Sequence, residues 1–323
     1  MFHDLACIWQ DTNAQAQRDR AVMTIRLGID CFAMAHEVYE SLADRNRCSI
    51  QPLNPESLQG TSGLHDAVRM QQGLPWKHNT LVNPRQLTRL TLSTEDSSAA
   101  AQAFIGTHAA ANSYDLLAVQ PTSERVLQQA CTSLEVDIIA FDLAKRLPFR
   151  FKPGPLQLAL KRGLFFEICY APALREETAR RNLFANALAL ARATGGKGII
   201  ISSGARSAFE LRGPYDVINM ATLFGLSEQD AKAALTTNCE AVLAHAQSRQ
   251  AYRGTVLLTS TTETQQQRQQ PAQPANTASQ QAGLRDQTSV PRAATVHNPN
   301  IRTHTAGKAA PASATKQRKR KNR

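Results

Sequence analysis

The sequence predicts an α/β fold, a closed (β/α) TIM-barrel-like fold with about seven parallel strands. Short apolar runs alternate with helical patterns through the first 250 residues or so, and such alternation requires parallel strands joined by crossovers. The apolar run between Gly198 and Gly204 is continuous, as in a strand buried on both faces. Seven or eight strand–helix units over this length match a closed barrel. An open doubly wound sheet remains an alternative, because a sequence does not show closure.

The expected elements follow one another in a regular order. Strands are expected at residues 2–8, 29–36, 87–92, 114–119, 136–143, 164–170 and 199–201. Helices are expected at residues 12–27, 97–111, 124–133, 156–162, 174–193, 214–224 and from 227 onward. Pro214 suits a first helical turn, where its missing N–H would have no partner. Gly225 can close that helix in the left-handed conformation, and Ser227 is a typical N-cap for the next helix.

Two segments interrupt this order. Residues 39–84 contain four prolines among glycines, serines and asparagines, which predicts a long loop or an insertion. From about residue 251 the chain consists mainly of Gln, Thr, Ser, Ala and Pro without apolar periodicity. Such a segment buries too little surface to offset its ordering entropy. We therefore expect one barrel domain at residues 1–250, with an insertion at 39–84, and a disordered basic tail at 251–323.

The excess positive charge is concentrated in the tail. Residues 1–251 hold 25 Lys/Arg and 24 Asp/Glu, a net charge of +1, whereas residues 252–323 hold 12 Lys/Arg and two acids, a net charge of +10. The high pI is therefore no evidence for a basic globular surface. The basic run at residues 316–323 fits nuclear import or loose RNA contact, and a merely solubilising tail is the alternative.

Several other classes of protein and site are disfavoured. The six cysteines include no C-x-x-C pair, so a cysteine-based metal site is not expected. The Gly-Gly-Lys-Gly segment at 195–198 follows a helix and precedes a strand, the reverse of a phosphate loop, so it is interpreted as a helix stop. No run reaches 18 apolar residues and no signal peptide begins the chain. A soluble protein made in a reducing compartment is expected, with no membrane partner.

Two basic loops are the candidate RNA-binding surface. The loop at residues 145–153 follows one strand and combines four cations with Phe149 and Phe151, while two arginines follow the strand near residue 201. Cations suit phosphates and aromatic rings suit bases. Loops that follow parallel strands emerge on one face of a barrel, so the two clusters could form one surface. The RNA-binding candidates are Lys145, Arg146, Arg150, Lys152, Arg206 and Arg212. The alternative is a solvated turn with both phenylalanines packed inward.

A metallohydrolase is the second hypothesis, because barrels of this size often carry metal ligands at strand ends. Its candidate ligands are His3, Asp4, His36, Asp142 and Glu167. The first strand offers one histidine and no H-x-H pair, and lone histidines near strand ends are more often core or surface residues. No G-x-S-x-G frame surrounds Ser203. Catalytic and metal-binding residues are therefore not expected, and this hypothesis requires several of the five candidates to converge.

A set of motifs in the predicted order resembles one known family. The motifs are Leu-Thr-Arg-Leu-Thr at 87–91, Leu-Pro-Phe-Arg-Phe-Lys at 147–152, Arg-Gly-Pro-Tyr-Asp-Val at 212–217, Leu-Phe-Gly-Leu-Ser at 223–227 and Thr-Asn-Cys at 237–239. Together they resemble the thirty-kilodalton protein subunits of ribonuclease P and ribonuclease MRP. The resemblance covers about residues 1–250 and is densest from residue 87 onward.

The resemblance implies a barrel of the polymerase-and-histidinol-phosphatase (PHP) type without that superfamily's full metal-ligand set. It implies a non-catalytic, cofactor-free subunit of nuclear and nucleolar ribonucleoproteins, in which the RNA carries the chemistry. The implied partners are ribonuclease P RNA, MRP RNA, precursor tRNA and other protein subunits, especially a small RRM-like subunit of the Pop group. The implied roles are removal of the 5′ leader from precursor tRNA and ribosomal RNA processing. The alternatives are a metal-dependent phosphoesterase on the same barrel and a scaffold that binds only proteins.

Overall fold

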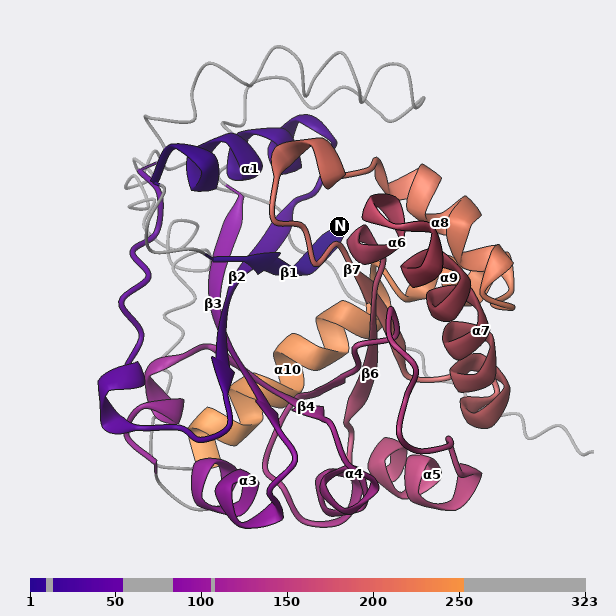
Figure 1. The fold of residues 1–323 in the computed structure, drawn as a ribbon. Coiled ribbons are helices and arrows are strands. Elements are labelled where there is room, and N and C mark those ends of the chain that lie inside the picture. Colours follow the sequence, from indigo (N-terminus) through magenta and orange to yellow (C-terminus); the bar gives the residue numbers. More distant parts are fainter. Residues whose placement is uncertain (10–13, 55–83, 106–107, 253–323) are drawn as a thin grey trace, which may run out of the picture. The chain divides into compact units, whose positions relative to one another are not determined.

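A single parallel sheet of seven strands forms a nearly closed barrel with helices around it (Figure 1). The computed structural model describes residues 1–9, 14–54, 84–105 and 108–252. The strands pair in sequence order and are β1 His3–Ile8, β2 Cys31–Tyr39, β3 Arg85–Thr94, β4 Leu116–Pro121, β5 Ile138–Ala140, β6 Phe165–Cys169 and β7 Ile199–Ser202. The predicted fold class is confirmed. Most of the predicted insertion and of the tail lies outside the described residues.

The helices follow the strands as crossovers, as the alternating pattern predicts. They are α1 Ala14–Arg26, α3 Ser97–Phe104, α4 Glu124–Thr132, α5 Pro153–Lys161, α6 Ala171–Arg175, α7 Glu177–Thr194, α8 Pro214–Leu223, α9 Glu228–Ala233 and α10 Thr237–Tyr252. Short 3₁₀ turns are η1 Asp44–Asn46, η3 Ala111–Ser113 and η4 Ala208–Glu210. Among the described helices, none has the length and apolar character that crossing a membrane requires.

Two helix predictions were wrong in extent. The helix expected at 97–111 ends at Phe104, and a separate 3₁₀ turn forms at 111–113. The helix expected at 174–193 is interrupted at Glu176, whose backbone is extended, with φ −140° and ψ 140°. Helix propensity is a weak guide to such boundaries, because tertiary contacts override it. The helix end expected at Gly225 and the helix start expected at Ser227 are confirmed. Gly225 has φ +85°, and the Ser227 side chain accepts from the Asp230 N–H.

Alternate residues of each strand point into the barrel, and these form two layers. The lower layer, toward the N-terminal ends of the strands, is apolar. It comprises Leu5, Cys31, Ala33, Leu87, Leu116, Ala118, Ile138 and Ile200. The residue two positions after Leu87 is Arg89, and the one two positions after Phe165 is Glu167, so charged groups occupy the next layer up. The other face of the sheet packs against the surrounding helices in a separate apolar cluster.

Helix α10 closes the lower end of the barrel, a role that the sequence did not reveal. Its Cys239, Val242, Leu243 and Ala246 belong to the same apolar cluster as the lower layer, and Figure 1 shows the helix lying across the ring of strands. We call α10 the plug, because it fills this end of the barrel. It is bound to the carboxylate of Asp137, a fully buried residue just before β5.

The Asp137 carboxylate is surrounded by donors from α10 and β4. It accepts hydrogen bonds from His245 Nδ1 (2.9 Å), from Arg249 Nε (3.1 Å) and Nη2 (2.9 Å), and from the Leu117 N–H (2.9 Å). Arg249 Nη2 also donates to the Asp115 carbonyl (3.2 Å). A buried carboxylate with this many donors is satisfied only while α10 stays docked.

The first and last strands meet at the upper, C-terminal end of the barrel. The Gly204 N–H donates to the Ala6 carbonyl (2.9 Å) and the Ile8 N–H to the Ala205 carbonyl (3.1 Å). The buried Asp4 carboxylate accepts from the Ser203 N–H (2.9 Å). Gly204 is required in this seam because its φ is +60° and an added Cβ would lie 2.8 Å from Cys169 Cβ.

Replacing Asp137 tests whether this buried carboxylate holds the plug. We expect Asp137→Ala to lower the free energy of unfolding by about 3–5 kcal/mol, because it leaves the Arg249 guanidinium buried without a counter-charge. Asp142→Ala is the matched control at the other end of β5, since Asp142 makes only an exposed pair with Lys145 and should change stability by no more than about 1 kcal/mol. Urea denaturation of both variants is the measurement. Equal losses would contradict the role of Asp137.

Candidate nucleic-acid interface

A cavity of about 530 Å³ opens at the C-terminal ends of the strands. We call it the mouth cavity. Functional sites of β/α barrels lie at this face, because the loops after the strands converge there. Its lining is mixed, with apolar, polar and charged groups from all seven strands or the loops after them. The polar and charged lining residues on its wall and rim include Glu37, Tyr39, Thr91, Ser93, Gln120, Lys145, Arg146, Arg175, Glu176 and Arg206.

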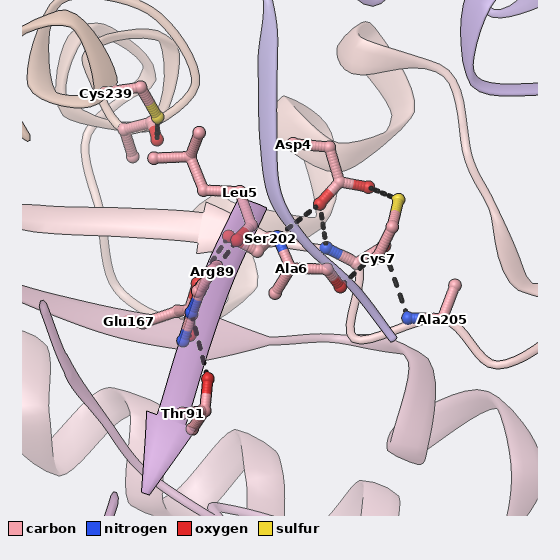
Figure 2. Close-up of polar contacts among 12 residues, drawn as sticks. Asp4, Leu5, Ala6, Cys7, Arg89, Thr91, Glu167, Ser202, Ala205 and Cys239 are labelled. Atoms are coloured by element: carbon pink, nitrogen blue, oxygen red, sulfur yellow. Dashed lines mark hydrogen bonds and ion pairs between the residues drawn. The ribbon is translucent and has the colours of Figure 1, made fainter. Parts of the chain in front are cut away.

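The floor of the mouth cavity is an ion pair that crosses the barrel from β3 to β6 (Figure 2). Arg89 Nη1 and Nη2 each lie 2.6 Å from one oxygen of Glu167, and both side chains are almost completely buried. The remaining donors and acceptors are also used. Arg89 Nη1 donates to the Leu5 carbonyl (2.8 Å), Arg89 Nε to Thr91 Oγ1 (3.0 Å), and Ser202 Oγ to Glu167 Oε1 (2.6 Å).

Local backbone irregularity and small side chains make this pair possible. The register between β1 and β2 shifts between Asp4 and Cys7, so Leu5 lies in a bulge and its carbonyl faces Arg89. Alanines at positions 35 and 140 also line the cavity beside the pair. Burial alone would lower the pKa of the Arg89 guanidinium, but the charge of Glu167 and its hydrogen bonds outweigh burial and raise that pKa. The Arg89 guanidinium therefore remains protonated.

Three of the six predicted RNA-binding residues lie together at the rim. Lys145 and Arg146 come from the loop after β5 and Arg206 from the loop after β7, and all three line the mouth cavity. Lys145 pairs with Asp142 (2.8 Å), and Arg206 lies 3.6 Å from Glu37. The hydrogen bond to Asp142 raises the pKa of Lys145. Arg146 makes no ion pair with any described residue.

The other three predicted residues do not line the cavity. Arg150 is exposed farther along the loop, and Lys152 pairs with Glu124 (2.5 Å) on α4. Arg212 Nη1 donates to the carbonyls of Phe209 and Leu211, both at 2.8 Å, so this guanidinium secures its own loop. These three residues therefore do not share the mouth cavity with Lys145, Arg146 and Arg206, and RNA contact by any of the six stays a prediction.

The phenylalanines of the basic loop pack inward, as the alternative interpretation predicted. Phe149 is buried and Phe151 is half-buried, and both rings contact Phe141, with centroid distances of 6.3 and 5.1 Å. These rings are therefore core residues that anchor the loop. An exposed aromatic residue at the mouth is instead Tyr39, which the sequence analysis missed. Side chains of a strand alternate between its two faces, so every second residue from Cys31 along β2 faces the barrel interior. Counting in this way would have placed Tyr39 at the mouth.

Arg175 is a second residue that the sequence left unassigned. It lines the mouth cavity and forms a bidentate pair with Glu210, with distances of 2.5 and 2.7 Å. Glu210 also accepts from the Arg206 N–H (2.7 Å). The hydrogen bond that Arg175 donates to Glu210 raises the pKa of Arg175. This pair holds the η4 turn against α6 and so orients the loop that carries Arg206.

The five candidate metal ligands are dispersed. His3 Nδ1 lies 3.3 Å from the Leu235 carbonyl, and burial lowers its pKa. His36 Nδ1 is 2.6 Å from Tyr114 Oη. Asp142 pairs with Lys145, and Glu167 with Arg89. Asp4 is used within the β1–β7 seam. Within the described ranges, no three His, Cys, Asp or Glu side chains are placed to hold one metal ion, so the condition for the metallohydrolase hypothesis is not met.

Comparison with known proteins identifies similar chains. The family model described as RNase P subunit p30 matches residues 1–251. Ribonuclease P protein subunit p30 of Mus musculus is 44% identical over 170 residues, which cover 53% of this chain and 63% of the mouse protein. Ribonuclease P/MRP protein subunit RPP1 of Saccharomyces cerevisiae is 32% identical over 136 residues, which cover 42% of this chain and 46% of the yeast protein. The chain thus spans less than two thirds of the length of these curated relatives.

A solved structure shares the fold. A chain in the cryo-EM structure of archaeal Ribonuclease P with mature tRNA superposes with a TM-score of 0.51 at 12% identity. The alignment covers 83% of this chain and all of the archaeal chain. At this identity the similarity is evidence for the fold alone, and it agrees with the barrel described above.

A double-mutant cycle tests whether Arg89 and Glu167 stabilise the barrel as a pair. We expect Arg89→Met to lower the free energy of unfolding by about 3–5 kcal/mol, because Glu167 becomes an uncompensated buried charge. The double variant Arg89→Met with Glu167→Met should recover most of this loss, since it removes both charges and keeps the volume filled. Urea denaturation of the two single variants and the double variant measures the coupling. Additive losses in the double variant would show that the pair is not a unit.

Proposed function

Because the chain belongs to the RNase P subunit p30 family, we propose that it is a protein subunit of the ribonuclease P and ribonuclease MRP ribonucleoproteins. In this role it binds the catalytic RNA and supports removal of the 5′ leader from precursor tRNA and the processing of ribosomal RNA. The observation that carries the proposal is the family match, which extends from the first strand to the last turn of α10. The yeast relative is named as a subunit of both ribonuclease P and MRP, which supports the second particle.

The proposal assigns the chemistry to the RNA and not to this chain. The position where a barrel enzyme would hold ligands is filled by Arg89 and Glu167, whose polar atoms already bond to each other, Ser202, Thr91 and the Leu5 carbonyl. A carboxylate held by two guanidinium nitrogens and a hydroxyl is poorly placed to act as a base or a metal ligand. The rival proposal, a phosphoesterase on the same barrel, has no convergent ligand set among the described residues to support it.

RNA contact is proposed for the rim cations Lys145, Arg146 and Arg206. Their ion pairs with Asp142 and Glu37 are solvent-exposed, and exposed pairs contribute little stability, so phosphates can replace the carboxylates. Arg150, Lys152 and Arg212 remain candidates for separate contacts outside the mouth. Other subunits, including a small RRM-like protein of the Pop group, and precursor tRNA are the further proposed partners.

The proposed location is the nucleus, including the nucleolus, where such particles would act on tRNA and rRNA precursors. The basic run at residues 316–323 supports this location as a candidate import signal.

Isolation of the particle tests the proposed function. The tagged full chain, purified from its own cells, should bring down ribonuclease P RNA and MRP RNA, detected by sequencing the co-purified RNA. A tagged unrelated basic protein controls for non-specific capture. Enrichment of neither RNA over this control would refute the proposal.

Salt dependence tests the rim contacts. We expect replacing Lys145, Arg146 and Arg206 with Gln to reduce the slope of log affinity against log salt by about 2–3, since each lost phosphate contact removes about 0.7–0.9. The matched control replaces Lys161, Arg192 and Lys197, three exposed cations at the opposite end of the barrel. The measurement is salt-titrated binding to the co-purified RNA, with circular dichroism to confirm folding. Equal slopes in both triple variants would assign RNA contact to other surfaces.

A further inference from the structure

We propose that the mouth cavity receives one unpaired nucleotide of the bound RNA, with its base against Tyr39 and its phosphate on Arg146. This inference rests on the proposed function, because it takes RNA as the ligand. It adds a recognition site to a surface that would otherwise contact only the phosphate backbone. Cations at a rim bind any sequence, whereas a cavity that admits a base distinguishes unpaired from paired RNA.

The size of the mouth cavity suits a ligand of this class. Its volume of about 530 Å³ lies within the range of small-molecule sites, about 300–1,000 Å³. The Arg89–Glu167 pair and the apolar layer beneath it close the cavity from below. A double helix is too wide to enter such a space, so only a nucleotide turned out of a helix, or a single-stranded one, can reach the floor.

Tyr39 provides an aromatic surface at the rim. It is the last residue of β2 and belongs to the inward-facing row of that strand, yet its side chain remains 62% exposed. Its hydroxyl donates to Glu37 Oε2 (3.1 Å), which restricts the ring. An exposed, oriented ring is what base stacking requires.

The backbone turns sharply just after this ring. Glu40 has φ +68°, and no other non-glycine residue in the described ranges has a positive φ. Its N–H donates to the Ser93 carbonyl (2.8 Å). A non-glycine residue in the left-handed region is disfavoured and persists where the surroundings require it. Here the turn ends β2 directly after Tyr39, at the rim of the cavity.

Above the Arg89–Glu167 pair, four cations and three carboxylates line the cavity, so the proposed anion site depends on particular cations and not on an excess of positive charge. Arg146 lines the cavity and has no ion-pair partner among the described residues. The Lys145 side chain is 82% exposed and that of Arg206 is 54% exposed, so both can turn toward a phosphate. The nearby carboxylate of Glu37 is already engaged by Tyr39 and Arg206.

Uncharged polar groups on the cavity wall can contact the edge of a base. Ser93 and Gln120 line the cavity from neighbouring strands. Neither side chain makes a hydrogen bond with another described residue, so their donors and acceptors are available to a ligand. Thr91 accepts from Arg89 Nε (3.0 Å), and its own hydroxyl hydrogen remains to donate.

Synthetic RNA hairpins test the proposal with the full-length protein. In each hairpin a polyethylene-glycol linker replaces the loop nucleotides. The first is then fully paired, the second carries a single bulged 2-aminopurine, and the third carries one unpaired nucleotide at its 3′ end. We expect the protein to prefer an unpaired probe over the paired hairpin by roughly five- to one-hundred-fold, the range that one base–aromatic stack provides. Quenching of 2-aminopurine fluorescence reports stacking directly. The second and third hairpins distinguish an internal nucleotide from a terminal one.

Variants at two exposed aromatic residues provide the control. Tyr39→Leu should abolish the preference and the quenching, while Tyr39→Phe should keep both. Phe209→Leu should change neither, because Phe209 is 90% exposed on η4 but does not line the cavity. A preference that survives Tyr39→Leu, or equal binding of all hairpins by the natural protein, would overturn the inference while leaving the proposed function intact. Binding of no hairpin and no cellular RNA would overturn both.

A protein occupant would give a different result. If Tyr39→Leu released another subunit from the purified particle without changing hairpin binding, the cavity would be a protein-docking site, and the inference would be wrong.

Discussion

The ion pair between Arg89 and Glu167 determines how the interior of this barrel is divided. Two opposite charges far from water are stable only when every donor and acceptor is satisfied. Here the Leu5 bulge, Thr91 and Ser202 supply the remaining partners. The pair thereby joins strands from opposite sides of the barrel and forms a polar layer above an apolar one. The apolar layer and helix α10 lie beneath the pair, and the mouth cavity opens above it.

The lower end of the barrel is closed by a different arrangement, which also depends on a buried carboxylate whose oxygens accept hydrogen bonds from fixed donors. Helix α10 covers the apolar layer, and Asp137 holds the helix through His245 and Arg249. A plug held only by apolar contacts could slide, because such contacts are not directional. A buried carboxylate with fixed donors selects one position. Helix α10 is therefore held in one position at the lower end, and the mouth cavity opens at the opposite end.

The strands could be predicted from local pattern, whereas the site could be predicted only in part. Continuous apolar runs such as residues 199–201 mark parallel strands wherever they occur, and loops after such strands share one face. That reasoning correctly brought Lys145, Arg146 and Arg206 together. It could not show that Arg212 would bond to its own loop. Nor could it show that Arg89 and Glu167 meet, because they are 78 positions apart and pair only through the closed barrel.

The position of the ion pair also limits what kind of recognition the mouth can perform. Carboxylates at this level could serve chemistry only if their oxygens were free, and those of Glu167 are engaged by Arg89 and Ser202. Above the pair lies the mouth cavity, whose rim carries cations, carboxylates and the exposed ring of Tyr39. Paired RNA can reach the rim but not the floor, so paired and unpaired nucleotides would make different contacts with the same surface. In the proposed RNA-binding role, the rim would supply affinity for phosphates and the cavity would supply discrimination between paired and unpaired nucleotides.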